Sequence, residues 1–259
     1  MDTCAKIGLQ GSVISEKLDG ELRDIASVEA NAAMDDTSRH EGCLLLRLTA
    51  IQCAYLLGRH EVLAALYKGT IANFRAFYGP HCDDKVRPKS LWNVSWNLYT
   101  DDLACWSAVM KDEHTQAMLS RFDLDSNDPT EGTEQSQIIV ARMLLSLLRK
   151  DPEAIARDMK ALEGTRTSKS ARSKLYGKVI KAVACDGDHD AVVSFLQAWK
   201  KKVFRPVAQN HRFSYHATVL CHLYGITIDD PDLSLHIIDV PEAVKARARA
   251  AVATLDVKV

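Results

Sequence analysis

The sequence predicts an all-α protein made of stacked antiparallel helix hairpins in an α-solenoid-like array. Two observations predict this class. Apolar residues recur at spacings of three and four along most of the chain, which is the period of a helix with one buried face. Short polar turns join successive helical segments, as they do in arrays of helix hairpins. We expect residues 1–259 to form a single domain whose core needs no disulfide or metal.

The first two predicted helices follow an N-terminal stretch, residues 1–40. One covers about 41–57, and Gly58 is a candidate C-cap because glycine adopts the left-handed conformation without strain. The second ends at Gly79-Pro80, since proline cannot continue a helix. Their apolar stripes are Leu44, Leu48, Ile51 and Tyr55, and Leu63, Leu66, Phe74 and Phe77.

Further helices follow in order. An aromatic stripe predicts one continuous helical face, and such spacing is typical of a core face rather than of a ligand groove. This stripe is Trp92, Trp96, Tyr99, Leu103, Trp106 and Met110. Later stripes cover 138–148, 175–183, 192–199 and 213–224. Asp151 and Pro152 are placed to cap and open a helix, and Gly225 to end the last one.

The turns between these segments share a composition of glycine and charged residues. They lie at 58–61, 111–113, 150–153 and 186–189, and a second amphipathic helix is expected directly after each. The consensus residues of tetratricopeptide and ankyrin repeats are absent. Only Ile226-Thr-Ile228 and His236-Ile-Ile238 are candidate strands.

Composition excludes several classes of function. The formal net charge is −1, so we expect no general attraction to nucleic acid or to an acidic membrane. The seven cysteines are odd in number and scattered without a CxxC pair, which favours a reducing compartment such as the cytoplasm. No secretory signal and no apolar run of the ~18 residues that a membrane helix needs is visible.

A search for chemistry finds no catalytic, cofactor or metal residues that we would assign. The histidines do not cluster at the i, i+4 spacing of a helical metal site. His81-Cys82-Asp83-Asp84 combines a nucleophile, a base and carboxylates, but catalytic partners usually come from distant positions. Asp35-Asp36 and Asp101-Asp102 are typical of helix ends and solvated faces. Lys200-Lys201-Lys202, with Arg205 and Arg212, could bind phosphate but also suits the end of a helix.

An acidic loop at 123–134 places oxygen-bearing side chains at the positions of an EF-hand. Position six, where an EF-hand needs glycine, is Asp128, and the following Pro129 favours extended geometry there. We therefore interpret the loop as an acidic surface segment, with calcium binding as the alternative.

The order of these features resembles a known family. The residues that carry the resemblance are Phe74-Arg-Ala-Phe77-Tyr78, Trp96 to Trp106, Met110 to Glu113, Asp188 to Trp199, Leu220 to Asp230 and Val240-Pro241. This layout resembles the all-helical immunity proteins of bacterial polymorphic-toxin systems, especially immunity protein family forty-nine. The tail from Phe195 to Pro241 is also similar to immunity proteins that oppose nuclease toxins with a PoNe-type domain. Residues 1–40 are outside the resemblance.

The resemblance implies a cytoplasmic protein, not an enzyme, that binds a cognate toxin and needs no cofactor. Acidic residues are our candidates for partner binding, because charge complementary to a basic toxin would speed capture. They are Asp123, Asp125, Asp128 and Glu131 in one loop, and Asp229, Asp230 and Asp232 in another. The alternatives are a helical-repeat scaffold, chaperone or regulator that binds other proteins, and a calcium-dependent or Cys/His enzyme.

Overall fold

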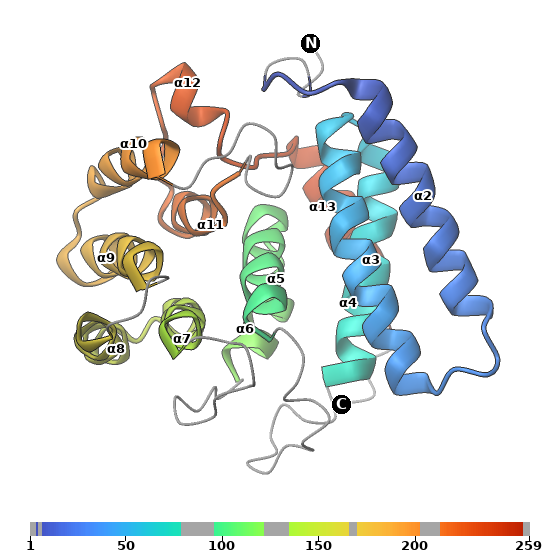
Figure 1. The fold of residues 1–259 in the computed structure, drawn as a ribbon, viewed down its shortest axis with the longest axis horizontal. Helices are drawn as coiled ribbons and strands as arrows, with labels where there is room; N and C mark the ends of the chain where they lie inside the picture. Colours follow the sequence, from blue (N-terminus) through green and yellow to red (C-terminus); the bar gives the residue numbers. More distant parts are fainter. Residues whose placement is uncertain are drawn as a thin grey trace. The chain divides into compact units, whose positions relative to one another are not determined.

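The computed structural model describes residue 4 and residues 7–78, 96–121, 135–165, 170–202 and 213–255. These residues form twelve α-helices and no strand, which confirms the all-α class (Figure 1). None of the helices in these segments is both long enough and apolar enough to cross a membrane. The chain divides into two compact units, residues 1–82 with 240–259 and residues 83–239. The single domain stays a prediction.

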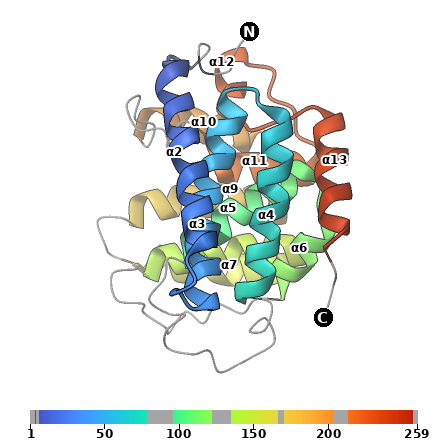
Figure 2. The ribbon, with the colours of Figure 1, turned by 90° about the vertical axis from the view of Figure 1, so that its right-hand side faces the viewer.

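Unit 1 contains four described helices from both ends of the chain. They are α2 (Gly11–Ala30), α3 (Asp36–Leu56), α4 (His60–Tyr78) and α13 (Glu242–Ala253). α2 packs against α3, α3 against α4, and α4 against α13 (Figure 2). The predicted stripes face this core, since Leu44, Ile51, Leu63 and Phe74 are all buried. Arg247 of α13 lies 3.7 Å from the Glu61 carboxylate of α4.

Unit 2 is a run of helices in which each described helix up to α11 packs against the next. They are α5 (Trp96–Met110), α6 (Glu113–Ser120), α7 (Gln135–Arg149), α8 (Pro152–Gly164), α9 (Ser170–Asp186), α10 (Ala191–Lys202), α11 (Tyr215–Tyr224) and the short α12 (Pro231–Ser234). α11 also packs against α5 and α9, and α7 packs against both α5 and α9 (Figure 1). These consecutive antiparallel contacts are the stacked hairpins that the sequence predicts.

The hairpin turns share one backbone design. Five described helices (α3, α5, α7, α9 and α11) are followed by a residue of positive φ, which is Gly58, Gly187 or Gly225 in three turns and Lys111 or Lys150 in two. The next N–H then donates to a carbonyl five residues earlier, as from Asp151 to Ser146 at 3.0 Å, or six residues earlier in the Gly187 turn. This closes the helix within two residues.

An aspartate begins the following helix in several turns. The Ala154 N–H donates to the Asp151 carboxylate at 3.0 Å, and Pro152 occupies the first turn, as predicted. Asp112 does the same for α6, where it accepts from the Thr115 N–H at 3.1 Å. A left-handed residue followed by a capping aspartate explains why such short turns can connect antiparallel helices.

Gly177 of α9 lies where α9 packs closely against α8 and α7. A Cβ atom built there would lie 2.5 Å from Leu162 Cδ2 of α8, 3.0 Å from Met159 Sδ and 3.3 Å from Met143 Sδ of α7. Gly177 therefore allows α9 to lie directly against both neighbouring helices.

Three features differ from the sequence predictions. The strand candidates at 226–228 and 236–238 are wrong, because both lie in irregular segments around α12. The Ile238 N–H donates to the Thr218 hydroxyl at 3.2 Å, so it does not belong to a ladder. Helices α2 and α13 were not expected, and the first predicted helix begins earlier, at Asp36.

Candidate functional site

The predicted acidic residues fall in two groups. Asp123, Asp125, Asp128 and Glu131 lie outside the described residues, and so do residues 81–84, Arg205 and Arg212. Asp229, Asp230 and Asp232 are described and exposed. Asp230 caps α12 by accepting from the N–H groups of Asp232 and Leu233. Asp232 is paired with Lys200 of α10, and this lysine lowers the pKa of the Asp232 carboxyl.

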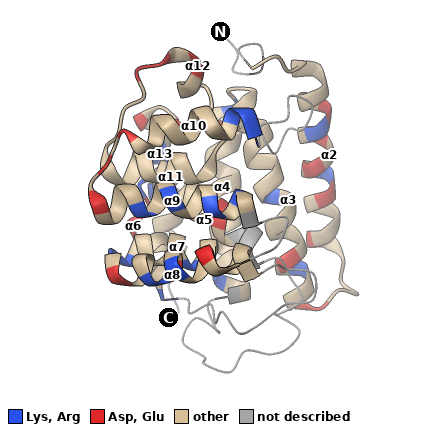
Figure 3. Ribbon diagram, turned by 60° about the vertical axis from the view of Figure 1, so that its left-hand side comes forward, with Lys and Arg blue, Asp and Glu red and all other residues tan. Residues whose placement is uncertain are grey.

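A second group of aspartates lies at the α9–α10 turn of the same unit. Asp186, Asp188 and Asp190 are exposed there. His189 in this turn contacts Tyr224 edge to face, with ring centroids 6.1 Å apart, and Tyr224 ends the helix that leads to Asp229. The two acidic segments therefore lie on the same edge of unit 2 (Figure 3). We call residues 186–190, Tyr224 and residues 229–232 the acidic edge.

Two aspartates of the acidic edge have partners nearby in the sequence. Asp188 accepts from the Ala191 N–H at 3.1 Å and so begins α10. The Asp186 carboxylate accepts from Lys181 Nζ at 2.7 Å. Sequence reasoning proposed residues 229–232 but missed the α9–α10 turn, where the run of alternating aspartates at 186–190 was interpreted only as a turn.

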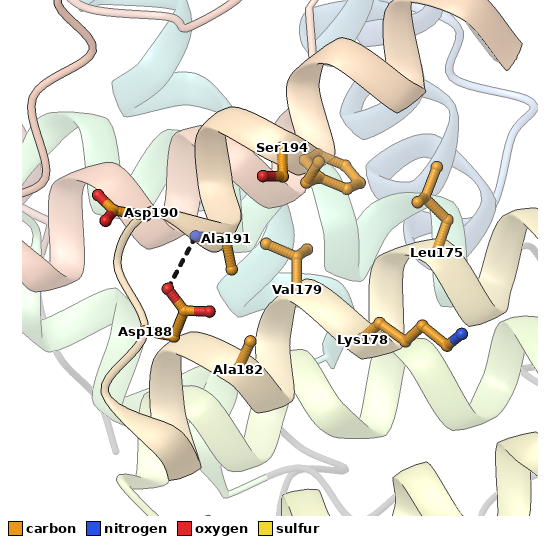
Figure 4. Close-up of a pocket in the computed structure, with 9 residues that line it drawn as sticks. Leu175, Lys178, Val179, Ala182, Asp188, Asp190, Ala191 and Ser194 are labelled. Carbon is orange, nitrogen blue, oxygen red and sulfur yellow. Dashed lines mark hydrogen bonds between the residues drawn. The ribbon is translucent and has the colours of Figure 1, made fainter.

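A shallow groove lies beside this turn, between α9 and α10, with a volume of about 360 Å³. Val179 and Phe195 contribute apolar side chains to its lining, and Lys178, Asp188 and Ser194 contribute polar ones (Figure 4). The side chains leave it open to solvent. Such a groove can accept a protruding apolar side chain of a partner, next to the charges of the acidic edge.

The basic residues at the end of α10 have a local explanation. Lys200, Lys201 and Lys202 occupy its last turn, where cations are favourable for the helix dipole. Lys200 forms an ion pair with Asp232, so less of its positive charge is available to bind a phosphate.

Unit 2 also contains a buried polar cluster between α5, α9 and α11. His216 of α11 is 5% exposed, and its ring stacks on Tyr176 of α9 with centroids 4.0 Å apart and planes at 14°. Its Nε2 atom lies 3.7 Å from Asp101 Oδ2 of α5. The Asp101 side chain is 27% exposed, but its Oδ1 atom is covered and has no hydrogen-bond partner among the described residues. Asp101 is therefore only partly solvated, where the sequence predicts an ordinary solvated face.

Burial sets the protonation of this cluster. It lowers the pKa of His216 to about 3, so the imidazole alone would be neutral. Burial and the neighbouring Asp102 raise the pKa of Asp101 well above its usual value. Burial and the hydrogen bond to Asp102 also raise the pKa of the Tyr215 hydroxyl. Burial therefore favours the neutral forms of His216, Asp101 and Tyr215.

The described cysteines are thiols rather than activated nucleophiles. Burial raises the pKa of Cys105 well above its usual value, with Asp102 and Asp101 adding to the effect. Burial raises the pKa of Cys221 to about 12. A thiolate nucleophile needs the opposite shift, from nearby cations or a helix N-terminus. These residues therefore behave as small apolar side chains of the core.

A further polar network lies in unit 1. Arg47 of α3 crosses Gly69 of α4 and donates to Asn73 and to Glu29 of α2. The Asn73 amide nitrogen is 3.0 Å from His40 Nδ1. These bonds join α2, α3 and α4, which is a structural role.

Two remaining sequence hypotheses concern metals and aromatic residues. Within the described segments, no group of three or more His, Cys, Asp or Glu side chains could hold a metal ion. Of the aromatic stripe, Leu103, Trp106 and Met110 are buried, which confirms a core face at these positions. Comparison with models of protein families, with curated proteins and with solved structures finds no match.

Proposed function

We propose that this protein is an immunity protein of a bacterial toxin system, which binds a cognate toxin in the cytoplasm and neutralises it by direct contact. The acidic edge carries the proposal, together with the sequence resemblance described above. It offers exposed aspartates from two segments that are distant in sequence and joined by the His189–Tyr224 contact. Neutralisation by contact requires a complementary surface and no catalytic group.

Charge on this edge would act mainly on the rate of capture. Exposed aspartates attract a basic partner over about one Debye length, roughly 8 Å at physiological ionic strength. Steering of this kind raises association rates far more than it slows dissociation. Because several of the aspartates are held by helix caps and turns, the charge is presented in a fixed arrangement, which reduces the entropy lost on binding.

Tyr224 offers an apolar anchor within the same edge. It is 36% exposed at the C-terminal end of α11, and the edge of its ring meets His189. Tyrosine is enriched among residues that dominate binding energy, because it contributes a large rigid contact area and one polar atom. An exposed tyrosine in contact with the turn that carries Asp186, Asp188 and Asp190 fits a partner with an apolar side chain set among lysines and arginines.

The first experiment identifies the partner. Tagged protein is captured from its own host, and bound proteins are read by mass spectrometry. One near-stoichiometric partner with a toxin-like domain, whose toxicity is relieved by co-expression, is expected. Several secretion or housekeeping proteins would favour a scaffold or chaperone instead, and no partner under toxin-expressing conditions would count against immunity.

The second experiment tests the acidic edge with a matched control. Asp190→Asn and Asp229→Asn together remove two negative charges without removing a helix cap. The control, Glu153→Gln with Glu163→Gln, removes two exposed negative charges from α8. Association with the captured partner is followed by stopped flow at several salt concentrations. We expect slower association and a weaker salt dependence for the first pair only. Equal effects of both pairs would remove this edge from the interface.

The acidic segment with Asp123, Asp125, Asp128 and Glu131 stays a second proposed contact. Replacing all four by serine is expected to slow association if this loop meets the partner. Unchanged kinetics would exclude it, and thermal stabilisation by calcium would favour the calcium alternative.

A further inference from the structure

The Asp101–His216 pair places two titratable groups against each other, a buried imidazole and a carboxyl with one covered oxygen. Asp101 Oδ2 and His216 Nε2 are 3.7 Å apart, and His216 Nε2 and Asp101 Oδ1 have no hydrogen-bond partner among the described residues. Tyr176 covers one face of the imidazole by stacking at 4.0 Å. The two groups come from α5 and α11, which pack directly against each other.

We propose that Asp101 and His216 together carry one proton in the folded protein, so that the pair brings no net charge to the contact between α5 and α11. With no proton, a carboxylate oxygen and an imidazole lone pair would face each other as two acceptors. With two protons, the pair would carry a buried positive charge. With one proton the pair has a donor opposite an acceptor and no net charge, whether the proton is on Oδ2 or on Nε2.

The surroundings favour this neutral state. The charged or titratable side chains near the pair are Asp102 and Cys105 of α5, Tyr215 of α11, and Tyr176 and Arg172 of α9. Asp102 disfavours a second negative charge on α5, and the positive charge of Arg172 acts on Tyr176. The raised pKa of Asp101 and the lowered pKa of His216 have the directions that a one-proton pair requires.

A pair that holds one proton in the folded protein gives a characteristic pH dependence of the free energy of unfolding. In the unfolded chain, Asp101 releases its proton near pH 4 and His216 near pH 6.5. Between about pH 4.5 and 6 the unfolded pair also holds one proton, so the pair contributes no slope in that window. Above about pH 7 the unfolded pair is empty while the folded pair keeps its proton. Stability from the pair then falls as pH rises.

Two single variants report on the two residues separately, because the free energy of unfolding relative to wild type changes with pH in opposite directions. In Asp101→Asn, the folded His216 is neutral while the unfolded one binds a proton, so stability relative to wild type falls as pH falls from about 6 to 4.5. In His216→Gln, the folded Asp101 keeps a proton that the unfolded one has lost, so relative stability falls as pH rises over the same window. Each slope corresponds to a tenfold change in the unfolding constant per pH unit.

The experiment is urea unfolding of the full chain at half-unit steps from pH 4.5 to 8, for wild type and both variants. Differences from wild type cancel the other titrating groups. We expect the free energy of unfolding relative to wild type to change with pH in opposite directions in the two variants. We also expect the NMR signals of the wild-type His216 imidazole to keep the same chemical shifts from pH 5 to 7. Slopes of the same sign, or His216 titrating near pH 6.5 in the folded wild type, would overturn the proposal. The NMR result decides the matter even where a variant does not fold.

Discussion

The close approach of α9 to α7 and α8 at Gly177 leads to the sharpest prediction of stability. In Gly177→Ala, the new Cβ meets Leu162 Cδ2 at 2.5 Å, where carbon atoms normally stay about 3.5–4.0 Å apart. Leu162 and Met143 are fully buried, so neither can move out into solvent. The surrounding side chains must shift by about 1 Å, and overpacking of this kind costs about 1–3 kcal/mol.

Helix propensity opposes this cost, and a control isolates it. Alanine is favoured over glycine inside a helix by about 1 kcal/mol. Gly20→Ala in α2 gains this term alone, because no atom lies within 4 Å of its added Cβ. We therefore expect Gly20→Ala to stabilise the protein by up to about 1 kcal/mol. Gly177→Ala should instead destabilise it by about 1 kcal/mol, with a range of roughly 0–2.

The assay is equilibrium urea unfolding of each variant beside wild type, followed by circular dichroism. The difference between the two variants reports the packing cost alone and should be about 1–3 kcal/mol. If both variants stabilise the protein by the same amount, the helices are not packed at Gly177 as the structure has them, and the reasoning fails.

Three other changes test the local physics. Asp158→Ala removes the buried partner of Arg142 and should lower the free energy of unfolding by about 3 kcal/mol, as measured with urea. A loss below about 1 kcal/mol would mean that Arg142 is solvated. Lys150→Gly relieves a positive φ and should stabilise by about 1 kcal/mol, whereas Asp151→Ala removes the N-cap of α8 and should destabilise by a similar amount. Cys105 should resist alkylation at pH 8 until the protein is unfolded, as read by peptide mass spectrometry, because burial raises its pKa.

Helices with large apolar stripes were predictable because their signal is local. The stripe Val192, Phe195, Leu196 and Trp199 lies wholly inside α10, and Gly225 ends α11 at φ 65° as a left-handed cap. α13 was missed because its buried face consists of Val244, Lys245, Ala248 and Val252, among alanines and arginines. Those residues cover little apolar area each, although they recur at the helical period.

The candidate sites depend on contacts that sequence spacing does not contain. His216 and Asp101 are on different helices, and neither has a neighbour in sequence that marks the pair. The acidic edge needs the His189–Tyr224 contact to bring residues 186–190 and 229–232 together. The β-branched residues at 226–228 indicated a strand, yet the described residues offer no extended partner with which they could pair.

The position of α13 in unit 1 has a consequence for synthesis on the ribosome. The surface of α4 that α13 covers is made first, and its cover arrives only after all of residues 83–239 have been translated. At typical rates of roughly 5–20 residues per second, that interval is on the order of ten to thirty seconds. During it, the apolar side of α4 is exposed to other nascent chains. A chaperone that binds this face would be released when Val244, Ala248 and Val252 dock.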